Sequence, residues 1–472
     1  MEWTIPRSRD LAIAFHFLQG KTLVQFIISA FSKNATIRLK MLVDREHNRV
    51  VFAESQKDFV DILLSFFTLP IGTIIRLLRK QPQPLRMGCL NSLYEGLENL
   101  EAAYFKNDIC KNMLLRPRNP YADECRKLKL NIDDTEPTKY YLCKNYQSDI
   151  SRGKHLHSGG DSLSIFGNMR CKCRQPMDHE VCLEDNGVEK EDNGDEGVFV
   201  AGTSTFIITD DLQIMPMSTA ASLALMKNLN VMDMKALEEM NFDVTLEQKL
   251  YHPDLVCFQR RYPIQTSRLE DISIVDKKIA FKITVRKSIQ KVLFAEAEED
   301  FINFLFSLLT FPLGSVLNFS GPTSLWGSIS NLWSSVEDCN YRYTLRKNDG
   351  FLYSVYIGTL TTTNTTTNHY SSNRISKFIS VLNSKSSTSP MGGGYMTGPS
   401  TFMVTDDLVV TPLSPISVFS FLESQNVPVD DLEQRMVSMG IEEALRLLEA
   451  CFISQSALTK VFVSQKGSKQ QK

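Results

Sequence analysis

Apolar and polar side chains follow a clear pattern near the start of the chain. Residues 37–43 begin with alternating apolar and polar side chains, and a polar turn and a second apolar run follow up to Ala53, which predicts a β-hairpin. A helix is predicted next, because apolar residues recur there at the spacing of one buried face: Phe59, Ile62, Leu63, Phe66 and Phe67. We expect Asp58 to cap this helix, and Pro70 and Gly72 to end it.

The same pattern returns in the second half of the chain. Residues 281–295 predict a second hairpin, Asp300 a second helix cap, and Pro312 with Gly314 a second stop. The helix between them has its own apolar stripe: Phe301, Phe304, Leu305, Leu308 and Leu309. We interpret both stripes as core rather than as ligand-binding surfaces.

Direct alignment shows that the two halves are homologous. Residues 51–72 and 293–314 share 10 identities in 22 positions, whereas unrelated sequences share about one or two. Residues 205–218 and 401–414 share 8 identities in 14, in the same order along the chain. The chain is therefore a tandem duplication. A further shared pattern predicts a second short helix in each copy: Leu93, Asn99 and Leu100 in the first, Leu325, Asn331 and Leu332 in the second.

Strands and helices come in mixed order and are joined by hairpins rather than by long helical crossovers. This predicts an α+β fold of two homologous modules, each opening with a β-hairpin and an amphipathic helix, with a mixed or antiparallel sheet. The expected organisation is an extension at 1–34, copy 1 at 35–245 with a Cys/His-containing insertion at about 105–197, an irregular connector at 246–277, copy 2 at 278–465 with a Ser/Thr/Asn-rich loop at 359–390, and a disordered tail at 466–472.

The two copies end differently. Copy 2 is predicted to close with helices, because Leu432, Met436 and Leu448 continue a helical spacing that is broken only at Gly440. Copy 1 loses this pattern after Met240. A missing helix would leave apolar surface uncovered in copy 1.

Composition describes a globular protein without a strong charge. The 472 residues are 43% hydrophobic and 22% charged, with a net charge of −2, which favours two or more packed domains and gives no general support for nucleic-acid binding. Ten scattered cysteines favour a reducing compartment, so we expect an intracellular protein, cytoplasmic or nuclear, with organelle targeting left open. Residues 11–31 are too often interrupted by polar residues to span a membrane.

Several segments identify a family. Leu-Lys-Met-Leu-Val-Asp at 39–44, Val-Phe-Ala-Glu at 51–54 and Leu-Pro-Ile-Gly-Thr-Ile at 69–74 resemble the opening of the plant family called domain of unknown function 674. The two Thr-Asp-Asp-Leu segments and residues 458–462 are similar to its later motifs. The resemblance covers roughly residues 35 to 463. It implies a tandem two-copy member from a land plant, and it brings no established biochemical activity.

Most cysteines of the chain fall within the insertion of copy 1. Cys143 and the pair Cys171 and Cys173 lie in a segment that, in relatives, resembles a small zinc ribbon. A structural zinc site needs four convergent donors, and the fourth stays open among these candidates: His155, His157, His179 and Cys182. Only one residue separates Cys171 from Cys173, and no cysteine follows Cys143 at ribbon spacing, so the pattern favours thiols without metal over a zinc site.

We find no catalytic signature in the sequence. The paired aspartates at 210–211 and 406–407 are interpreted as turn residues, because neighbouring strand residues point to opposite faces. There is no phosphate-binding glycine loop and no nucleophile elbow. We expect a non-enzymatic macromolecular interaction or scaffold protein. The alternatives are an enzyme or small-ligand binder with a pocket between the copies, and nucleic-acid binding through the Cys/basic segment.

Overall fold

The computed structural model describes most of both copies. The described residues are 37–47, 49–80, 87–129, 131–136, 139–143, 145, 162–171, 173–181, 197–200, 205–231, 234–244, 278–320, 328–338, 361–362, 379–381 and 394–463. The expected extension at 1–34, the connector at 246–277, most of the loop at 359–390 and the tail at 466–472 lie outside them.

Each copy forms one five-stranded antiparallel sheet, and the two sheets have the same topology. In copy 1 the strand order is β10-β1-β2-β8-β9, and in copy 2 it is β17-β11-β12-β15-β16. The strands of copy 1 are β1 (Ile37–Asp44), β2 (Arg49–Ser55), β8 (Phe206–Ile208), β9 (Ile214–Pro216) and β10 (Leu237–Val244). Those of copy 2 are β11 (Ile279–Arg286), β12 (Lys291–Glu298), β15 (Thr401–Thr405), β16 (Val410–Pro412) and β17 (Leu432–Met439). This confirms the α+β expectation.

The two predicted hairpins agree in register as well as in sequence. Lys40 lies opposite Glu54 in copy 1, and Lys282 lies opposite Glu296 in copy 2. Both hairpins have a register shift at the same place, before Val43 and before Val285. The predicted equivalence of the two hairpins is therefore confirmed, and it includes the register shift.

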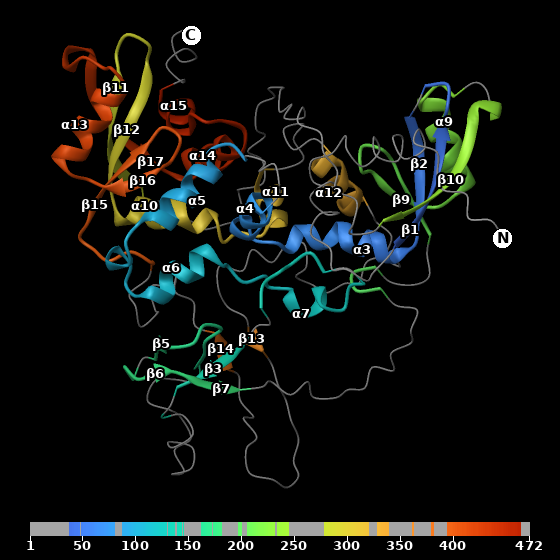
Figure 1. Ribbon diagram of the computed structural model, residues 1–472, viewed down its shortest axis with the longest axis horizontal. Coiled ribbons are helices and arrows are strands. Elements are labelled where there is room, and N and C mark those ends of the chain that lie inside the picture. Colours follow the sequence, from blue (N-terminus) through green and yellow to red (C-terminus); the bar gives the residue numbers. More distant parts are fainter. Residues whose placement is uncertain are drawn as a thin grey trace.

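Most helices lie between or below the two sheets, whereas α9 (Thr219–Asn228) and α13 (Pro415–Ser424) cover the outer face of their own sheets (Figure 1). Besides α9, copy 1 contributes α3 (Lys57–Ser65), a 3-10 helix η1 (Phe66–Thr68), α4 (Ile71–Arg79), α5 (Leu90–Asn99), η2 (Ala102–Tyr104), α6 (Asp108–Leu115), α7 (Ala122–Cys125) and η3 (Met234–Ala236). Besides α13, copy 2 contributes α10 (Glu299–Leu308), α11 (Leu313–Ser320), α12 (Ser328–Asp338), η5 (Val429–Asp431), α14 (Ile441–Ile453) and α15 (Ala457–Phe462). The phenylalanine stripes of α3 and α10 are core, because Phe59 and Phe301 are fully buried.

Two local expectations need correction. Asp58 and Asp300 lie in the first turn of their helices rather than at the caps, which are Gln56 and Glu298. Gly72 does not stop a helix but lies inside α4. Its backbone N–H donates to the Leu309 carbonyl of copy 2 at 2.7 Å, and a side chain there would meet that oxygen at 3.0 Å.

The close of copy 2 also differs from the expectation. Residues 432–439 form strand β17 rather than a helix, and the closing helices begin only at Ile441. The reason is pairing: β17 runs antiparallel to β11 along its whole length. In copy 1 the corresponding strand β10 ends at Val244, and residues 245–277 lie outside the described part of the chain. The core side of β1 is nevertheless covered, because Leu39 and Met41 are fully buried.

The two copies exchange equivalent helices. Helix α5 of copy 1 packs in copy 2, where the Cys89 N–H donates to the Cys451 carbonyl of α14 at 2.8 Å. Helix α12 of copy 2 packs in copy 1, where the Ile214 N–H of β9 donates to Ser335 Oγ at 2.9 Å. Figure 1 shows α5 beside α14 and α10 at one end and α12 near the sheet of copy 1 at the other. Both predicted second helices exist. Their packing aligns Leu93 with Leu332, not with Leu325.

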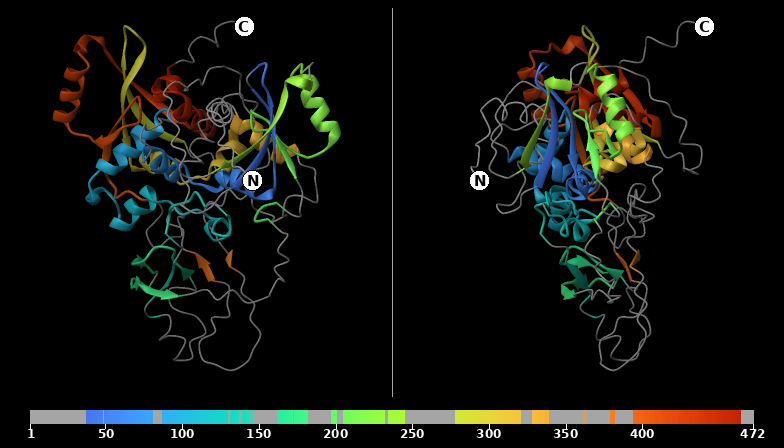
Figure 2. Two further views of the ribbon diagram at one scale, coloured as in Figure 1. Left: turned by 45° about the vertical axis from the view of Figure 1, so that its right-hand side comes forward. Right: turned by 90° about the vertical axis from the view of Figure 1, so that its right-hand side faces the viewer.

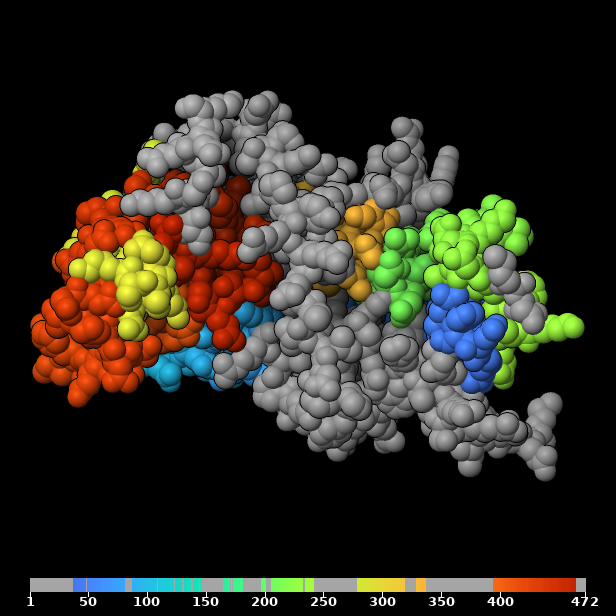
Figure 3. All heavy atoms as spheres, turned by 90° about the horizontal axis from the view of Figure 1, so that it is seen from above, coloured from blue at the N-terminus to red at the C-terminus, as the bar shows by residue number. Residues whose placement is uncertain are grey.

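Because of the exchange, most buried side chains of both copies belong to one continuous core, and each sheet has a separate small cluster on its other face, around Phe294 in copy 2 and Phe52 in copy 1. The sheets lie at opposite ends of the molecule, with β11 and β12 (yellow) at one end and β1 (blue) at the other in Figure 3. The insertion of copy 1 forms a small unit of short strands apart from both sheets, as both views of Figure 2 show. Its strands are β3 (Tyr140–Leu142), β4 (Ser162–Leu163), β5 (Met169–Arg170), β6 (Pro176–Met177) and β7 (His179–Val181); β13 (Thr361–Thr362) and β14 (Ile379–Val381) of copy 2 join β4.

Candidate metal centre and buried polar contacts

Two parts of the insertion bring three cysteines together. Strand β3 ends at Leu142 and is followed directly by Cys143. Strands β5 and β6 form a hairpin, and Cys171 and Cys173 lie in its turn. The turn is closed by the Arg174 N–H, which donates to the Cys171 carbonyl at 2.8 Å, with Arg174 in the left-handed region at φ 68°.

The three thiols converge on one point. Their sulfur atoms all lie within 4.8 Å of one another, and Cys143 Sγ and Cys173 Sγ are 3.3 Å apart. In a tetrahedral zinc site with Zn–S bonds of about 2.3 Å, neighbouring sulfurs are about 3.8 Å apart. The cluster therefore has the dimensions of a thiolate metal site. Among the described residues it is the one group of three or more His, Cys, Asp or Glu side chains close enough to share an ion.

Two backbone N–H groups point at these sulfurs. The N–H of Asn145 donates to the thiol of Cys143, and the N–H of Cys173 donates to that of Cys171. Each donor lies two residues after its cysteine, and such bonds stabilise the thiolate, which is the form that binds metal. Burial acts in the other direction: it raises the pKa of Cys143 to about 12 and also raises the pKa of Cys171. A bound cation would offset that burial.

The predicted ligands are thus only partly brought together. Cys143, Cys171 and Cys173 meet, with Leu142, Met169 and Met177 buried around them. His179 lies on β7, is exposed, and does not belong to the group. The other candidates for a fourth ligand, His155, His157 and Cys182, lie outside the described residues. The three thiols fit a thiophilic cation such as Zn²⁺.

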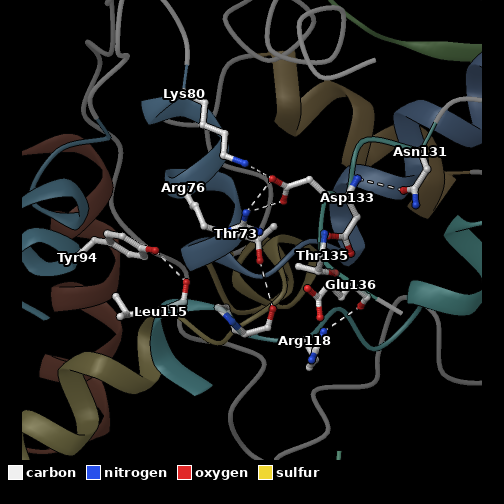
Figure 4. A network of polar contacts seen from close by, with 12 residues as sticks. Thr73, Arg76, Lys80, Tyr94, Leu115, Arg118, Asn131, Asp133, Thr135 and Glu136 are labelled. Carbon is white, nitrogen blue, oxygen red and sulfur yellow. Dashed lines mark hydrogen bonds and ion pairs between the residues drawn. The ribbon is translucent and has the colours of Figure 1, made fainter. Parts of the chain in front are cut away.

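Several basic side chains between residues 76 and 118, ahead of the clustered cysteines, bond acceptors within the protein. Asp134 accepts hydrogen bonds from Arg76, with a closest contact of 2.6 Å, and from Lys80. Arg79 pairs with Glu98 at 2.6 Å, and Arg118 donates to the Glu136 carbonyl at 2.9 Å. Figure 4 shows Arg76 and Lys80 of α4, together with Arg118, beside the loop at 131–136. Arg76, Arg79 and Lys80 are thus engaged in ion pairs within the protein.

A buried polar side chain holds the segment before the third strand in each copy. In copy 1 the carboxylate of Asp61 accepts the N–H groups of three consecutive residues, 198–200, at 2.7 to 2.9 Å. In copy 2 the equivalent residue is Asn303, whose side-chain oxygen accepts the N–H groups of Tyr395 and Met396. Burial raises the pKa of Asp61. Hydrophobic patterns do not reveal this pair of side chains, and the one signal in the sequence is that Asp61 and Asn303 occupy equivalent positions of the two copies.

The paired aspartates have two different roles. Asp407 accepts a hydrogen bond from Thr405 Oγ1 at 2.6 Å, as expected for a turn residue, and Asp211 does the same with Thr209. Asp406 instead accepts the N–H and the hydroxyl of Thr459 in α15, both at 2.8 Å. All four aspartates lie in turns, as expected. The side chain of Asp406 does not bond within its turn but anchors the closing helix α15. Neither pair holds a metal ion together with a third ligand in the described residues.

Comparison with known proteins identifies kinship only. The chain matches no curated protein and no solved structure. No helix in the described residues is long and apolar enough to cross a membrane. A family model described as "Protein of unknown function (DUF674)" matches residues 33–251 and again residues 250–442. The first match contains the whole sheet of copy 1 and the second contains the whole sheet of copy 2, and the chain belongs to this family as a tandem two-copy member.

Proposed function

We propose that this protein is a non-enzymatic interaction protein that binds a partner protein through the outer face of α13. Helix α13 is apolar on both sides. Its inner residues, Val418, Phe421 and Leu422, cover Phe294 and Met403 of the sheet. Its outer residues are bare: Ile416 is 78% exposed and Phe419 is 67% exposed.

The exposed pair on α13 is the observation that carries this proposal. A helix with apolar side chains on two opposite sides is typical of a position between two layers. Copy 1 provides an internal comparison, because Ala220 and Leu223 occupy the positions of Ile416 and Phe419 on α9. The bare apolar surface is therefore larger in copy 2. Large exposed apolar surfaces mark interaction sites in soluble proteins, and the matching partner is a protein that offers an apolar face.

The other readings have less support in the described residues. An enzyme with a pocket between the copies would need convergent acid and base groups at the joint, where Pro70 and Pro312 pair directly and apolar side chains fill the surroundings. A nucleic-acid site in the basic stretch would need unneutralised charge, whereas Arg76, Arg79 and Lys80 each pair with a carboxylate.

A structural zinc ion belongs to the proposal as the organiser of the insertion. Strands β3, β5 and β6 are two or three residues long, and strands this short give little stability on their own. Metal ligation by Cys143, Cys171 and Cys173 would join the end of β3 to the β5–β6 turn. Small units of this kind gain their folding energy from the metal.

The test asks whether partner binding depends on the exposed residues of α13. Partners captured by the full chain are identified, purified and titrated against the wild type, the double variant Ile416→Ser/Phe419→Ser, and the control Leu223→Ser on α9. We expect a purified protein partner whose dissociation constant rises at least tenfold with the double variant and is unchanged by the control. A partner that binds all three equally, or a set of captured proteins that the double variant does not alter, contradicts the proposal.

A further inference from the structure

Each copy has one long strand at the edge of its sheet. Strand β10 ends the sheet of copy 1 and β17 ends that of copy 2, and each is eight residues long. In the described residues, each of these strands pairs only with the first strand of its own hairpin. The outer edge of such a strand offers a row of backbone donors and acceptors to another strand, and proteins usually block it with charges.

Side chains on β17 are suited to pairing with another copy of the same strand. Leu432, Gln434 and Met436 point to the face of the sheet that α13 covers, and Met436 is 69% exposed. Glu433 and Arg435 point to the other face and form an ion pair at 2.7 Å. Two such strands, antiparallel and centred on Gln434, place Leu432 opposite Met436 and Glu433 opposite Arg435. Apolar residues then meet apolar residues, and opposite charges meet.

The equivalent strand of copy 1, β10, is less suited to pairing with its own copy because it has an acid at the central position. The position of Gln434 is taken by Glu239, which lies opposite Leu42 as Gln434 lies opposite Thr284. The same antiparallel arrangement of two β10 strands would bring Glu239 against itself. Glu238 is a second acid beside it, and within the chain Glu239 pairs with Lys40 at 3.0 Å and Glu238 with Arg45 at 2.6 Å. Like charges directly opposite each other destabilise strand pairing, so β10 is less suited than β17 to pairing with its own copy.

We infer that β17 pairs with β17 of a second copy of this chain. The contact is antiparallel, has Gln434 of each chain on the two-fold axis, and joins two five-stranded sheets into one of ten strands. Because the same patch is used on both subunits, the assembly closes at a dimer. The acidic β10 at the other end of each chain is less suited to continued growth. The contact lies on the β17 edge and is independent of the partner site on α13.

The experiment uses a charge at the axis of the proposed contact. Gln434 is exposed, so a charged residue is tolerated in the isolated chain, but it faces its own copy in the dimer. Molar mass is measured by light scattering after gel filtration of the full chain over a range of concentrations. We expect the wild type at twice 53.6 kDa, and Gln434→Lys and Gln434→Glu each at 53.6 kDa.

Mixing restores the contact. An equal mixture of the Gln434→Lys and Gln434→Glu chains is expected to return to the dimer mass, because opposite charges then meet at the axis. The control Glu239→Lys, at the equivalent position of β10, is expected to leave the dimer unchanged. Recovery in the mixture also shows that both variants are folded. A monomeric wild type at about 100 µM, which is well above the dissociation constant of a specific dimer, overturns the inference, as do dimers that persist in both single variants or variants whose mixture stays monomeric.

Discussion

Pro70 and Pro312 occupy the same position in the two copies and lie opposite each other in a short antiparallel bridge. The Ile71 N–H donates to the Phe311 carbonyl, and the Leu313 N–H donates to the Leu69 carbonyl, both at 2.9 Å. A residue that pairs with its own counterpart lies on a two-fold axis. The two copies are therefore related as the subunits of a symmetric dimer, and the exchange of α5 and α12 follows the same symmetry.

The exchange predicts that the two copies hold together without a covalent link. A protease site inserted between residues 250 and 270 and then cut should leave both halves in one peak on gel filtration, because α5 and α12 are each packed in the other copy. The matched variant is Gly72→Val, whose side chain would meet the Leu309 carbonyl across the joint. After cutting, it should release the halves more readily. Separate elution of the cut wild-type halves would contradict the exchange.

The stripes of α3 and α10 predict large and equal losses of stability. Phe59→Ala and Phe301→Ala should each lower the free energy of unfolding by roughly 3–5 kcal/mol, because both rings are fully buried. Denaturant titration measures the loss. Phe419→Ala is the control, since its ring is mostly exposed, and it should change stability by less than about 0.5 kcal/mol. Wild-type-like unfolding of either core variant would show that the stripe is not core.

Removing the Asp61 side chain in copy 1 should lower the free energy of unfolding more than removing the Asn303 side chain in copy 2. Asp61→Ala leaves three N–H groups without an acceptor and should cost on the order of 3 kcal/mol. Asn303→Ala leaves two and should cost about 2 kcal/mol. Both are measured by denaturant unfolding. Equal losses, or a smaller loss at Asp61, would mean that these hydrogen bonds do not hold the segment.

Asp406 predicts a specific pH dependence. Burial raises the pKa of Asp406 above its usual value, with the hydrogen bonds from Thr459 opposing that effect. Folding therefore favours the protonated form, so the contribution of Asp406 to stability is greatest at acidic pH and is lost as the pH rises through the folded-state pKa. Relative to Asp406→Asn, the wild type should gain stability when unfolding is measured at about pH 4 rather than pH 7. A difference that stays constant, or reverses, would contradict the sign.

The cysteine cluster predicts about one zinc ion per chain in protein purified without chelators. Cys171→Ser/Cys173→Ser should lose the metal, whereas Cys110→Ser, a buried thiol outside the cluster, should keep it. Chelation should lower the melting temperature of the wild type, and acidification should release the metal, because protons compete for the thiolates. Protein without zinc under these conditions would mean that the three thiols are structural on their own.

Local patterns predicted the local structure well. The hairpins, the phenylalanine stripes and the turns after β8 and β15 each depend on residues close together in sequence, and the duplication showed each of them twice. Strand β17 was predicted wrongly for a physical reason. Leu432 and Met436 are four residues apart, which suits a helix face, but pairing with β11 decides the conformation.

Long-range contacts were beyond the reach of sequence patterns. No periodicity reveals that α5 packs in the other copy, because its apolar face would suit either one. The three cysteines could be named as candidate metal ligands because of their residue type. Their convergence depends on contact between the end of β3 and the β5–β6 turn, which the sequence does not show. Asp406 resembled Asp210 in sequence. Its separate role comes from α15, which docks on it from 53 residues further along the chain.

The exchanged helices also bear on how the two halves can change over time. Helix α5 must fit against Val410 and Cys451 in copy 2, and helix α12 must fit against Ile214 in copy 1. A substitution at one of these contacts therefore requires a matching change in the other half, so the two halves are expected to change together rather than as independent duplicates. A chimaera that combines one half of this chain with the opposite half of a distant relative would disturb two contacts at once. Helix α5 would pack against a foreign copy 2, or helix α12 against a foreign copy 1, and in each case the second exchanged helix would be mismatched as well.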